Sequence, residues 1–119
     1  MGKDYKGTFY QEANMEIRIL EFDIKGDERG SLIALEGNKN IPFEIKRVYY
    51  IFNTKEGVRR GYHAHKTLEQ VLISTNGKCK ILLDDGYERQ IVELNQPNIG
   101  LYIGPRIWRE MFDFSQDVF

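Results

Sequence analysis

The sequence contains two histidines, His63 and His65, and they lie two positions apart. The residues around them alternate as in a β-strand, where side chains at positions i and i+2 share one face. We therefore expect both imidazoles to enter the same space. An imidazole has an ordinary pKa of about 6.5, so at neutral pH it can serve as a metal ligand or as a proton-transfer group.

Two further positions bear on that choice. The spacing from the histidine pair to Gln70 and on to Gly77 resembles the first motif of the cupin barrel, with an amide in place of the usual carboxylate ligand. Residues 100–111 resemble the second motif, with Arg109 where a metal-binding histidine would stand. A catalytic divalent metal needs about three imidazole or carboxylate ligands, and a guanidinium repels a cation. The sequence therefore predicts no metal and favours proton transfer.

The elements that must position these groups are strands. Period-two alternation recurs from Met15 onward, and no window shows a sustained helical period. Turn-forming residues, among them Asn76-Gly77, separate many short segments, which is typical of a barrel or jelly roll. We predict strands at residues 16–22, 31–36, 43–52, 61–65, 68–75, 78–83, 87–94, 100–103 and 107–114, with turns at 25–27, 37–38, 55–57, 76–77 and 84–86.

Composition indicates one modest domain. The 119 residues are 41% hydrophobic, enough for one barrel core, which we place at residues 15–119. Residues 1–14 form a polar head that we interpret as a disordered arm or a remnant of expression. The net charge of −1 argues against a nucleic-acid or membrane-surface protein. One cysteine, Cys79, and no membrane-length or signal-like apolar run predict a cytoplasmic protein.

Several polar residues interrupt apolar faces. In the predicted strand 43–52, Arg47 and Tyr49 share a face with apolar residues, so they either face solvent or line a polar pocket. Arg109 is in phase with apolar neighbours and is likewise a pocket candidate. Arg60 is either a ligand-binding residue or a solvated charge at a strand start, and Trp108 either stacks on a ligand ring or fills core.

Longer phrases carry a closer resemblance. Taken together they resemble the dTDP-4-keto-6-deoxy-D-glucose 3,4-ketoisomerases of the cupin fold, over about residues 22–117. The phrases are Asp27-Glu28-Arg29-Gly30-Ser31-Leu32, residues 40–51, Arg60-Gly61-Tyr62-His63-Ala64-His65-Lys66, Leu68-Glu69-Gln70-Val71-Leu72, Gly100-Leu101-Tyr102-Ile103-Gly104-Pro105 and Trp108-Arg109-Glu110-Met111.

The resemblance implies an all-β cupin fold and an isomerase that uses neither metal nor cofactor. Such an enzyme moves the keto group of a dTDP-linked 4-keto-6-deoxyhexose from C4 to C3 through an enediol, toward 3-amino-3,6-dideoxy sugars of bacterial surface glycans. A base removes the C3 proton, and donors stabilise charge on the oxygens. By resemblance His63 is the base, His65 supports it or relays protons, and Tyr49 hydrogen-bonds the reacting oxygens or orients His63.

The same resemblance implies the substrate-binding set, namely Arg29, Arg47, Arg60, Gln70, Trp108 and Arg109. The guanidinium of an arginine can donate two hydrogen bonds to the oxygens of the pyrophosphate or of the enediolate. The family also implies a homodimer with exchanged N-terminal strands, which brings Arg29 to the partner's active site. Arg29 resembles the pattern of galacto-forming members and Arg109 that of gluco-forming members, so the C4 configuration of the product stays open. Family members continue with a further strand after the position of Phe119, so we expect the barrel to lack its last strand.

Three other functions remain open. A dTDP-sugar 3,5-epimerase would share the fold and substrate but needs an acid and a base on opposite sugar faces, and no His–Asp pair is evident beside His63. A non-catalytic sugar-nucleotide-binding cupin would suit Gln70 and Arg109. A metal-dependent dioxygenase is the third alternative.

Overall fold

The computed structural model describes residues 7–9 and 15–115, and every regular element among them is a strand. The prediction of an all-β fold is therefore confirmed. The described residues include no helix long and apolar enough to cross a membrane. In chain order the strands are β1 (Gly7–Phe9), β2 (Ile17–Glu21), β3 (Lys25–Asp27), β4 (Gly30–Leu32), β5 (Arg60–His63), β6 (Gln70–Ile73), β7 (Cys79–Asp84), β8 (Arg89–Leu94), β9 (Ile99–Ile103) and β10 (Trp108–Phe112).

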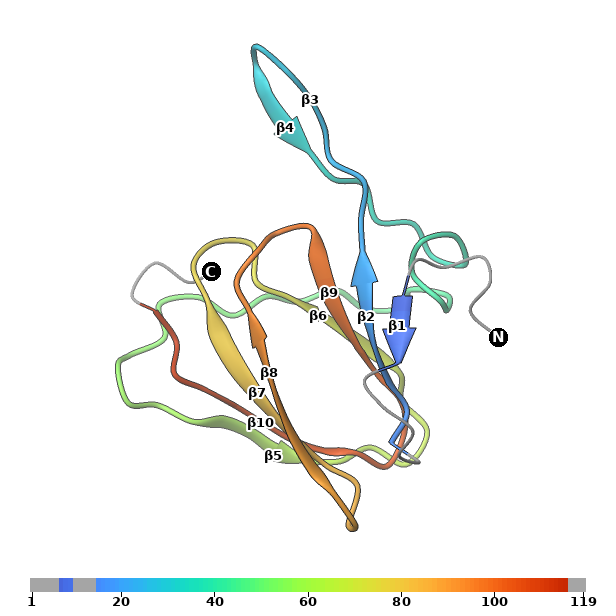
Figure 1. The fold of residues 1–119 in the computed structure, drawn as a ribbon, viewed down its shortest axis with the longest axis vertical. Coiled ribbons are helices and arrows are strands. Elements are labelled where there is room, and N and C mark those ends of the chain that lie inside the picture. Colours follow the sequence, from blue (N-terminus) through green and yellow to red (C-terminus); the bar gives the residue numbers. More distant parts are fainter. Residues whose placement is uncertain (1–6, 10–14, 116–119) are drawn as a thin grey trace.

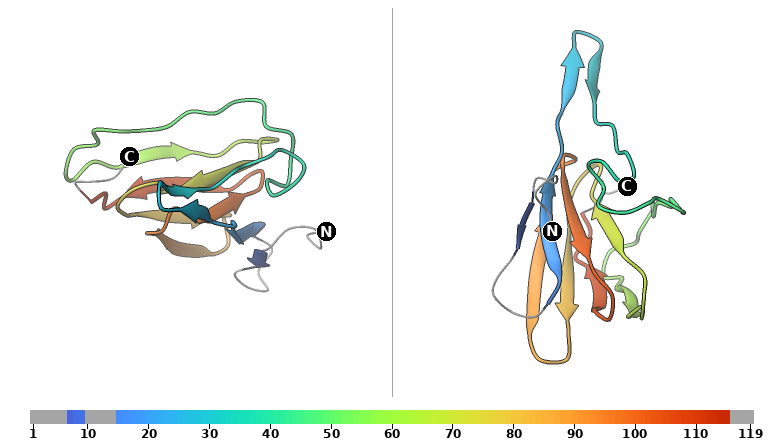
Figure 2. Two further views of the ribbon diagram at one scale, coloured as in Figure 1. Left: turned by 90° about the horizontal axis from the view of Figure 1, so that it is seen from above. Right: turned by 90° about the vertical axis from the view of Figure 1, so that its right-hand side faces the viewer.

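Two four-stranded antiparallel sheets face each other (Figure 1). One has the order β1-β2-β9-β6 and the other β5-β10-β7-β8, while β3 and β4 form a separate two-stranded hairpin. The views at right angles show two layers that are not closed into a barrel (Figure 2). The chain crosses between the layers after β5, β6, β8 and β9. The crossings after β5 and β9 meet, because the N–H of Arg106 donates to the carbonyl oxygen of His65.

The main core lies between the two sheets. Alternate residues of β7 are buried, as period-two patterning predicts, and they are Cys79, Ile81 and Leu83. They pack against the inward residues of the facing sheet, including Ile17 and Leu101. Polar positions such as Lys80 and Asp84 alternate with the buried ones. This sheet therefore has an inner face in the core and an outer face toward solvent.

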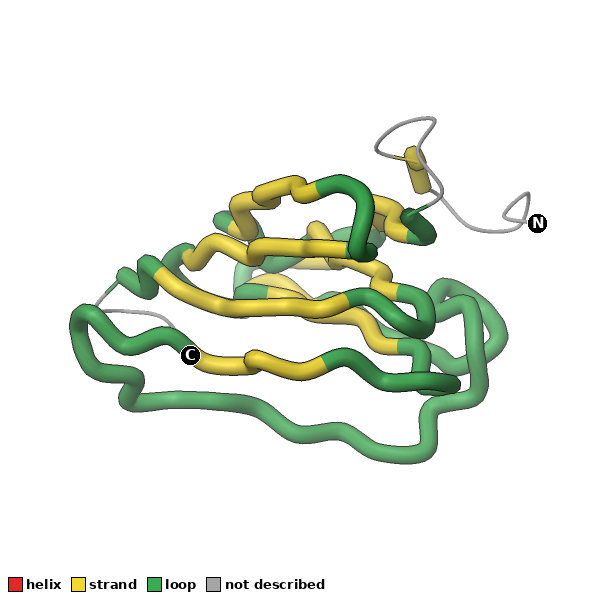
Figure 3. Tube along the Cα trace, turned by 90° about the horizontal axis from the view of Figure 1, so that it is seen from below, coloured by secondary structure: helices red, strands yellow, loops and turns green. Residues whose placement is uncertain are grey.

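A second apolar cluster lies on the far side of the β1-β2-β9-β6 sheet. Leu20, Phe22, Ile41 and Tyr102 form it, and Phe43 and Ile45 from the same long loop as Ile41 pack against it. The strand predicted at 43–52 is wrong, because residues 33–59 form no strand and make one isolated bridge. Figure 3 shows this stretch as a long loop along one side of the strands. Its alternating apolar residues suggested a strand, but only the first of them find a buried surface.

The hairpin of β3 and β4 projects away from the two sheets (Figure 1). The predicted turn at 25–27 is wrong, because these residues form β3 and the turn lies at Glu28 and Arg29. The predicted strand 31–36 is confirmed only as the short β4. The remaining predicted strands are confirmed with shifted ends, as β2 and as β5 to β10.

Part of the polar head has structure. Gly7–Phe9 forms β1, which pairs with β2 in the same chain. The other residues of the segment 1–14 lie outside the described residues, so the division into a head and one domain stays a prediction.

Candidate active site

The two histidines meet, as their spacing predicts. The ring centroids of His63 and His65 lie 4.6 Å apart, with the rings at 79° to each other. His63 is the last residue of β5, and His65 lies in the following connection toward β6. The pair therefore sits at one of the crossings between the sheets.

A β-bulge places His63 on the inner face. Arg60 pairs with Met111 and Gly61 with Glu110, whereas His63 pairs with Arg109. Tyr62 is thus an extra residue; without the bulge, Tyr62 would pair with Arg109, and His63 would pair with Trp108 and point to the outer face. Gly61 and Tyr62 both have positive φ, at 99° and 57°. A Cβ at Gly61 would lie 2.7 Å from the carbonyl oxygen of Arg109, so only glycine fits there.

A hydrogen bond to the backbone orients His63. Its Nδ1 lies 2.7 Å from the carbonyl oxygen of Gly61. A carbonyl only accepts, so Nδ1 must carry the proton and Nε2 keeps its lone pair in the neutral ring. The exposed imidazole therefore presents an unprotonated nitrogen that can accept a proton from a bound molecule.

His65 is held more deeply. Its carbonyl oxygen accepts a hydrogen bond of 2.5 Å from the N–H of Arg106, a residue with a φ of 66° in the turn before β10. Burial lowers the pKa of His65, and the charges of Arg109 and His63 lower it further. His65 is therefore neutral at neutral pH, as a residue that relays protons must be.

Arg109 is a buried cation between the sheets, with a side chain 2% exposed. Its Nη1 donates to Oε1 of Gln70 on β6, and its Nη2 donates to the carbonyl oxygen of Ile107 at 3.1 Å. Its Nε is buried and has no partner among the described residues. Burial lowers its pKa, while the phenol of Tyr49 acts in the opposite direction. Since an arginine keeps its proton even so, the site holds a fixed positive charge beside the histidines.

Tyr49 lies on the long loop beside Arg47. The guanidinium of Arg47 lies over the ring of Tyr49, 5.0 Å from its centroid. Tyr49 itself is 53% exposed, so the pair lies at the surface of the loop.

The structure thus brings four predicted residues together, His63, His65, Gln70 and Arg109, while Arg47 and Tyr49 stack on each other in the long loop. It does not bring Trp108 to them, since Trp108 lies on the outer face of its sheet. Arg60 is exposed at the start of β5. Arg29 lies at the turn of the projecting hairpin, where it pairs with Asp27 at 2.6 Å.

Sequence reasoning missed the bulge and the contact of Arg106 with His65. A signal for the bulge was present, because a glycine inside a strand pattern often marks one. No sequence signal indicated the backbone hydrogen bond of Arg106.

Within residues 7–9 and 15–115, no three His, Cys, Asp or Glu side chains gather in a group that could hold a metal ion. At one of the positions that carry metal ligands in the cupin motif stands Gln70, whose amide oxygen accepts a hydrogen bond from Arg109. The donors present do not fit a divalent cation, because a buried guanidinium lies where the cation would need a ligand.

Comparison with known proteins identifies the family. The model of the family "FdtA: WxcM-like, C-terminal" matches residues 15–119. The TDP-4-oxo-6-deoxy-alpha-D-glucose-3,4-oxoisomerase of Aneurinibacillus thermoaerophilus is 57% identical over 103 residues, which cover 87% of this chain and 74% of that protein.

Solved structures agree. A 3,4-ketoisomerase from Helicobacter canadensis has a TM-score of 0.85 at 58% identity, covering 88% of this chain and 79% of its own. A mutant of QdtA, a 3,4-ketoisomerase from Thermoanaerobacterium thermosaccharolyticum in complex with TDP-4-keto-6-deoxyglucose, has a TM-score of 0.84 at 46% identity, covering 93% and 77%. The predicted cupin-type fold and the resemblance to ketoisomerases are both confirmed, and the chain belongs to the FdtA (WxcM-like, C-terminal) family.

Proposed function

We propose that this protein is a sugar-nucleotide 3,4-ketoisomerase that converts dTDP-4-keto-6-deoxy-D-glucose to a dTDP-3-keto-6-deoxyhexose for the synthesis of 3-amino-3,6-dideoxy sugars. The observation that carries the proposal is the orientation of His63 beside Arg109 on one inner face. The 57% identical relative is named a 3,4-oxoisomerase of the same substrate class, which supports it.

In the proposed reaction His63 Nε2 removes the proton on C3, which the adjacent C4 carbonyl acidifies. The electron pair of the C3–H bond forms the C3–C4 double bond, and the C4 oxygen takes a proton to give the enediol. The C3 hydroxyl then loses its proton as the carbonyl forms, and C4 receives a proton. Carbon, oxygen and hydrogen are conserved, so no oxidant or other co-reactant is needed.

Arg109 stabilises the developing charge on the C3 and C4 oxygens as a fixed positive charge beside His63. Neutral His65 relays protons between His63 and the oxygens. Tyr49 hydrogen-bonds a reacting oxygen from the open side. Arg47 and Arg60 bind the pyrophosphate, a role that their exposed positions support.

We also propose that the active protein is a homodimer with exchanged N-terminal strands, in which Arg29 reaches the partner's site. The projection of the β3–β4 hairpin and the 86% exposed side chain of Arg29 support this role. Mixing inactive Arg29→Ala and His63→Asn chains tests it. Shared sites would restore one intact site per mixed dimer, whereas a mixture as inactive as its parents would contradict the exchange.

We also propose a cytoplasmic location, which a sugar-nucleotide substrate supports and which cell fractionation tests. The enzymatic proposal itself is tested by proton NMR of dTDP-4-keto-6-deoxyglucose with catalytic protein in deuterated water. Deuterium at C4 of a new 3-keto product would establish the isomerase and reveal its gluco or galacto configuration. Exchange at C3 and C5 would indicate a 3,5-epimerase, and an unchanged spectrum would indicate a binding protein.

A further inference from the structure

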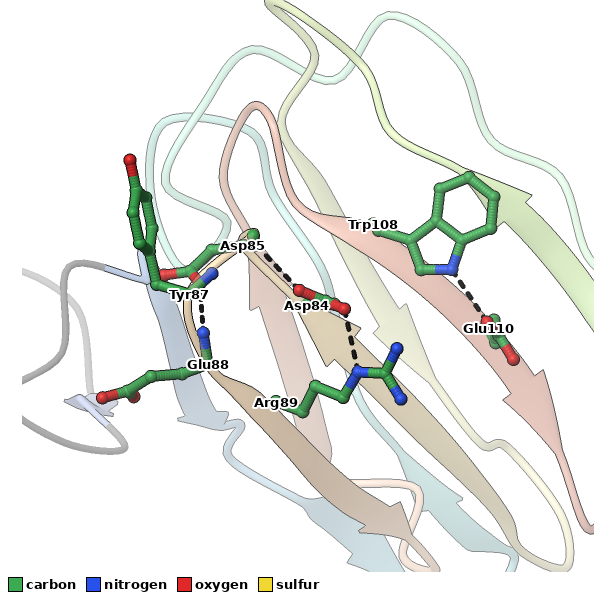
Figure 4. Close-up of polar contacts among 8 residues, drawn as sticks. Asp84, Asp85, Tyr87, Glu88, Arg89, Trp108 and Glu110 are labelled. Atoms are coloured by element: carbon green, nitrogen blue, oxygen red, sulfur yellow. Dashed lines mark hydrogen bonds and ion pairs between the residues drawn. The ribbon is translucent and has the colours of Figure 1, made fainter.

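The outer face of the β5-β10-β7-β8 sheet carries a linked set of side chains directly behind the bulge. Indole Nε1 of Trp108 donates to Oε2 of Glu110 at 2.8 Å (Figure 4). Nε of Arg59 donates to the other oxygen, Oε1, at 2.9 Å. The ring of Tyr62 meets that of Trp108 edge to face, with centroids 6.1 Å apart. We call these four residues, Arg59, Tyr62, Trp108 and Glu110, the outer clamp.

The outer clamp spans the irregular step. Arg59 precedes β5 and Tyr62 is the extra residue of the bulge, while Trp108 and Glu110 flank Arg109 on β10. Arg59 is further fixed by lying over the ring of Phe112, 4.0 Å from its centroid. The contacts of Arg59 with Glu110 and Phe112 and of Tyr62 with Trp108 therefore tie the two strands together on either side of the bulge, while the hydrogen bond between Trp108 and Glu110 lies within β10.

The backbone there needs such support. A φ of 57° at Tyr62 is a left-handed conformation that a bulky aromatic residue rarely adopts, and it is kept only where surroundings hold it. If Tyr62 returned to regular strand geometry, the register would slip by one residue. His63 would then face outward and lose its bond to the carbonyl oxygen of Gly61.

We propose that the outer clamp positions His63, and that Trp108 and Glu110 are positioning residues that act through the backbone from the face opposite the substrate. This inference rests on the proposed ketoisomerase function for its kinetic consequence, but not for its structural one. It gives Trp108 a role other than stacking on the nucleotide base.

The test compares Trp108→Phe and Glu110→Gln with the wild-type protein. Trp108→Phe lacks the indole N–H, and Glu110→Gln keeps a single acceptor oxygen, so it can accept from Trp108 or from Arg59 but not from both. Nitrogen NMR of the His63 imidazole reports its tautomer, and the same samples give kcat, KM and the pH profile of kcat. Lys80→Gln is the matched control, since it removes an ion pair with Asp113 on the same outer face, away from the bulge.

We expect a mixed or altered His63 tautomer in both variants, with kcat reduced about tenfold to a hundredfold, as misplacement by about an ångström does. KM and dTDP affinity should change less than about twofold, and Lys80→Gln should match the wild type. An unchanged tautomer together with unchanged kcat would overturn the proposal. So would weaker dTDP binding by Trp108→Phe with an unchanged tautomer, because that result indicates direct stacking.

Tyr62→Ala keeps the test decisive if either variant fails to fold. Alanine removes the ring that contacts Trp108 but keeps a Cβ, so the positive φ still needs support from its surroundings. The outer clamp predicts an altered His63 tautomer in a well-folded protein, whereas a native tautomer would contradict it. An inactive wild-type protein with altered tautomers in the variants would refute the ketoisomerase function alone.

Discussion

The carbonyl oxygen of Gly61 accepts a hydrogen bond from Nδ1 of His63 at 2.7 Å, so a residue of the bulge itself fixes which nitrogen of the histidine is basic. The contact is local, since the two residues lie two positions apart in the chain. It joins the strand irregularity to the chemistry in a single interaction.

His63→Asn should therefore abolish isomerisation, because asparagine cannot accept the C3 proton. We expect dTDP affinity to stay within about a factor of ten, since only proton transfer is removed. Turnover is measured by NMR and binding by calorimetry. A variant with near-normal turnover would rule out His63 as the base.

Gly61→Ala should destabilise the protein by about 1–3 kcal/mol or more. The positive φ at this position is unfavourable for alanine, and the added Cβ would lie too close to the carbonyl oxygen of Arg109. The control is Gly57→Ala, where φ is also positive, at 79°, but nothing lies within 4 Å of the added Cβ. Urea unfolding gives both free energies of unfolding. Equal losses in the two variants would mean that the close approach at Gly61 costs nothing.

Much of the fold follows from alternation, because each inward residue of a strand such as β7 finds a core partner. The long loop shows where this reasoning ends. Val48, Tyr50 and Phe52 alternate as in a strand, yet their side chains are 77%, 78% and 59% exposed. A segment forms a strand only where another backbone lies within hydrogen-bonding distance, and the local sequence does not determine whether one does.

The site shows the same division. The spacing of His63 and His65 was enough to predict that their rings meet, and the mismatch of Gln70 and Arg109 with metal ligands was the reason to predict proton transfer in place of metal chemistry. The hydrogen bond between Arg109 and Gln70 was not predictable, because it depends on how the two sheets are placed against each other. The sequence did not decide on which face of its strand Trp108 lies, since a shift of the strand register by one residue moves a side chain to the other face.

Gln70→Met should cost about 1–3 kcal/mol in the free energy of unfolding, because it removes the acceptor of Nη1 and leaves a buried guanidinium under-satisfied. Adding Arg109→Met should recover part of that loss, since two apolar groups need no partner. The four proteins of this double-mutant cycle are compared by urea unfolding. Additive losses would show that the two side chains do not interact.

Removal of metal ions should leave activity intact, because proton transfer by histidine needs none. After dialysis against a chelator, the isomerisation rate should stay within about twofold of the untreated protein, with metal content checked by mass spectrometry. Loss of activity that zinc or manganese restores would contradict this expectation.

The lowered pKa of His65 gives the stability a specific pH dependence. In the unfolded chain His65 has its ordinary pKa of about 6.5, so on acidification its imidazole takes up a proton in the unfolded state before it does so in the folded state. Stability from this residue is therefore complete above that pH and is lost as the pH falls through the lower folded pKa. His65→Gln lacks the titrating group, so its stability should fall less between about pH 7.5 and about pH 5. Urea unfolding of both proteins at the two pH values gives the difference, which also subtracts the carboxylates that titrate in each. Parallel losses would mean that neither burial nor Arg109 disfavours the protonated imidazole, and a neutral proton relay beside His63 would then have no physical basis.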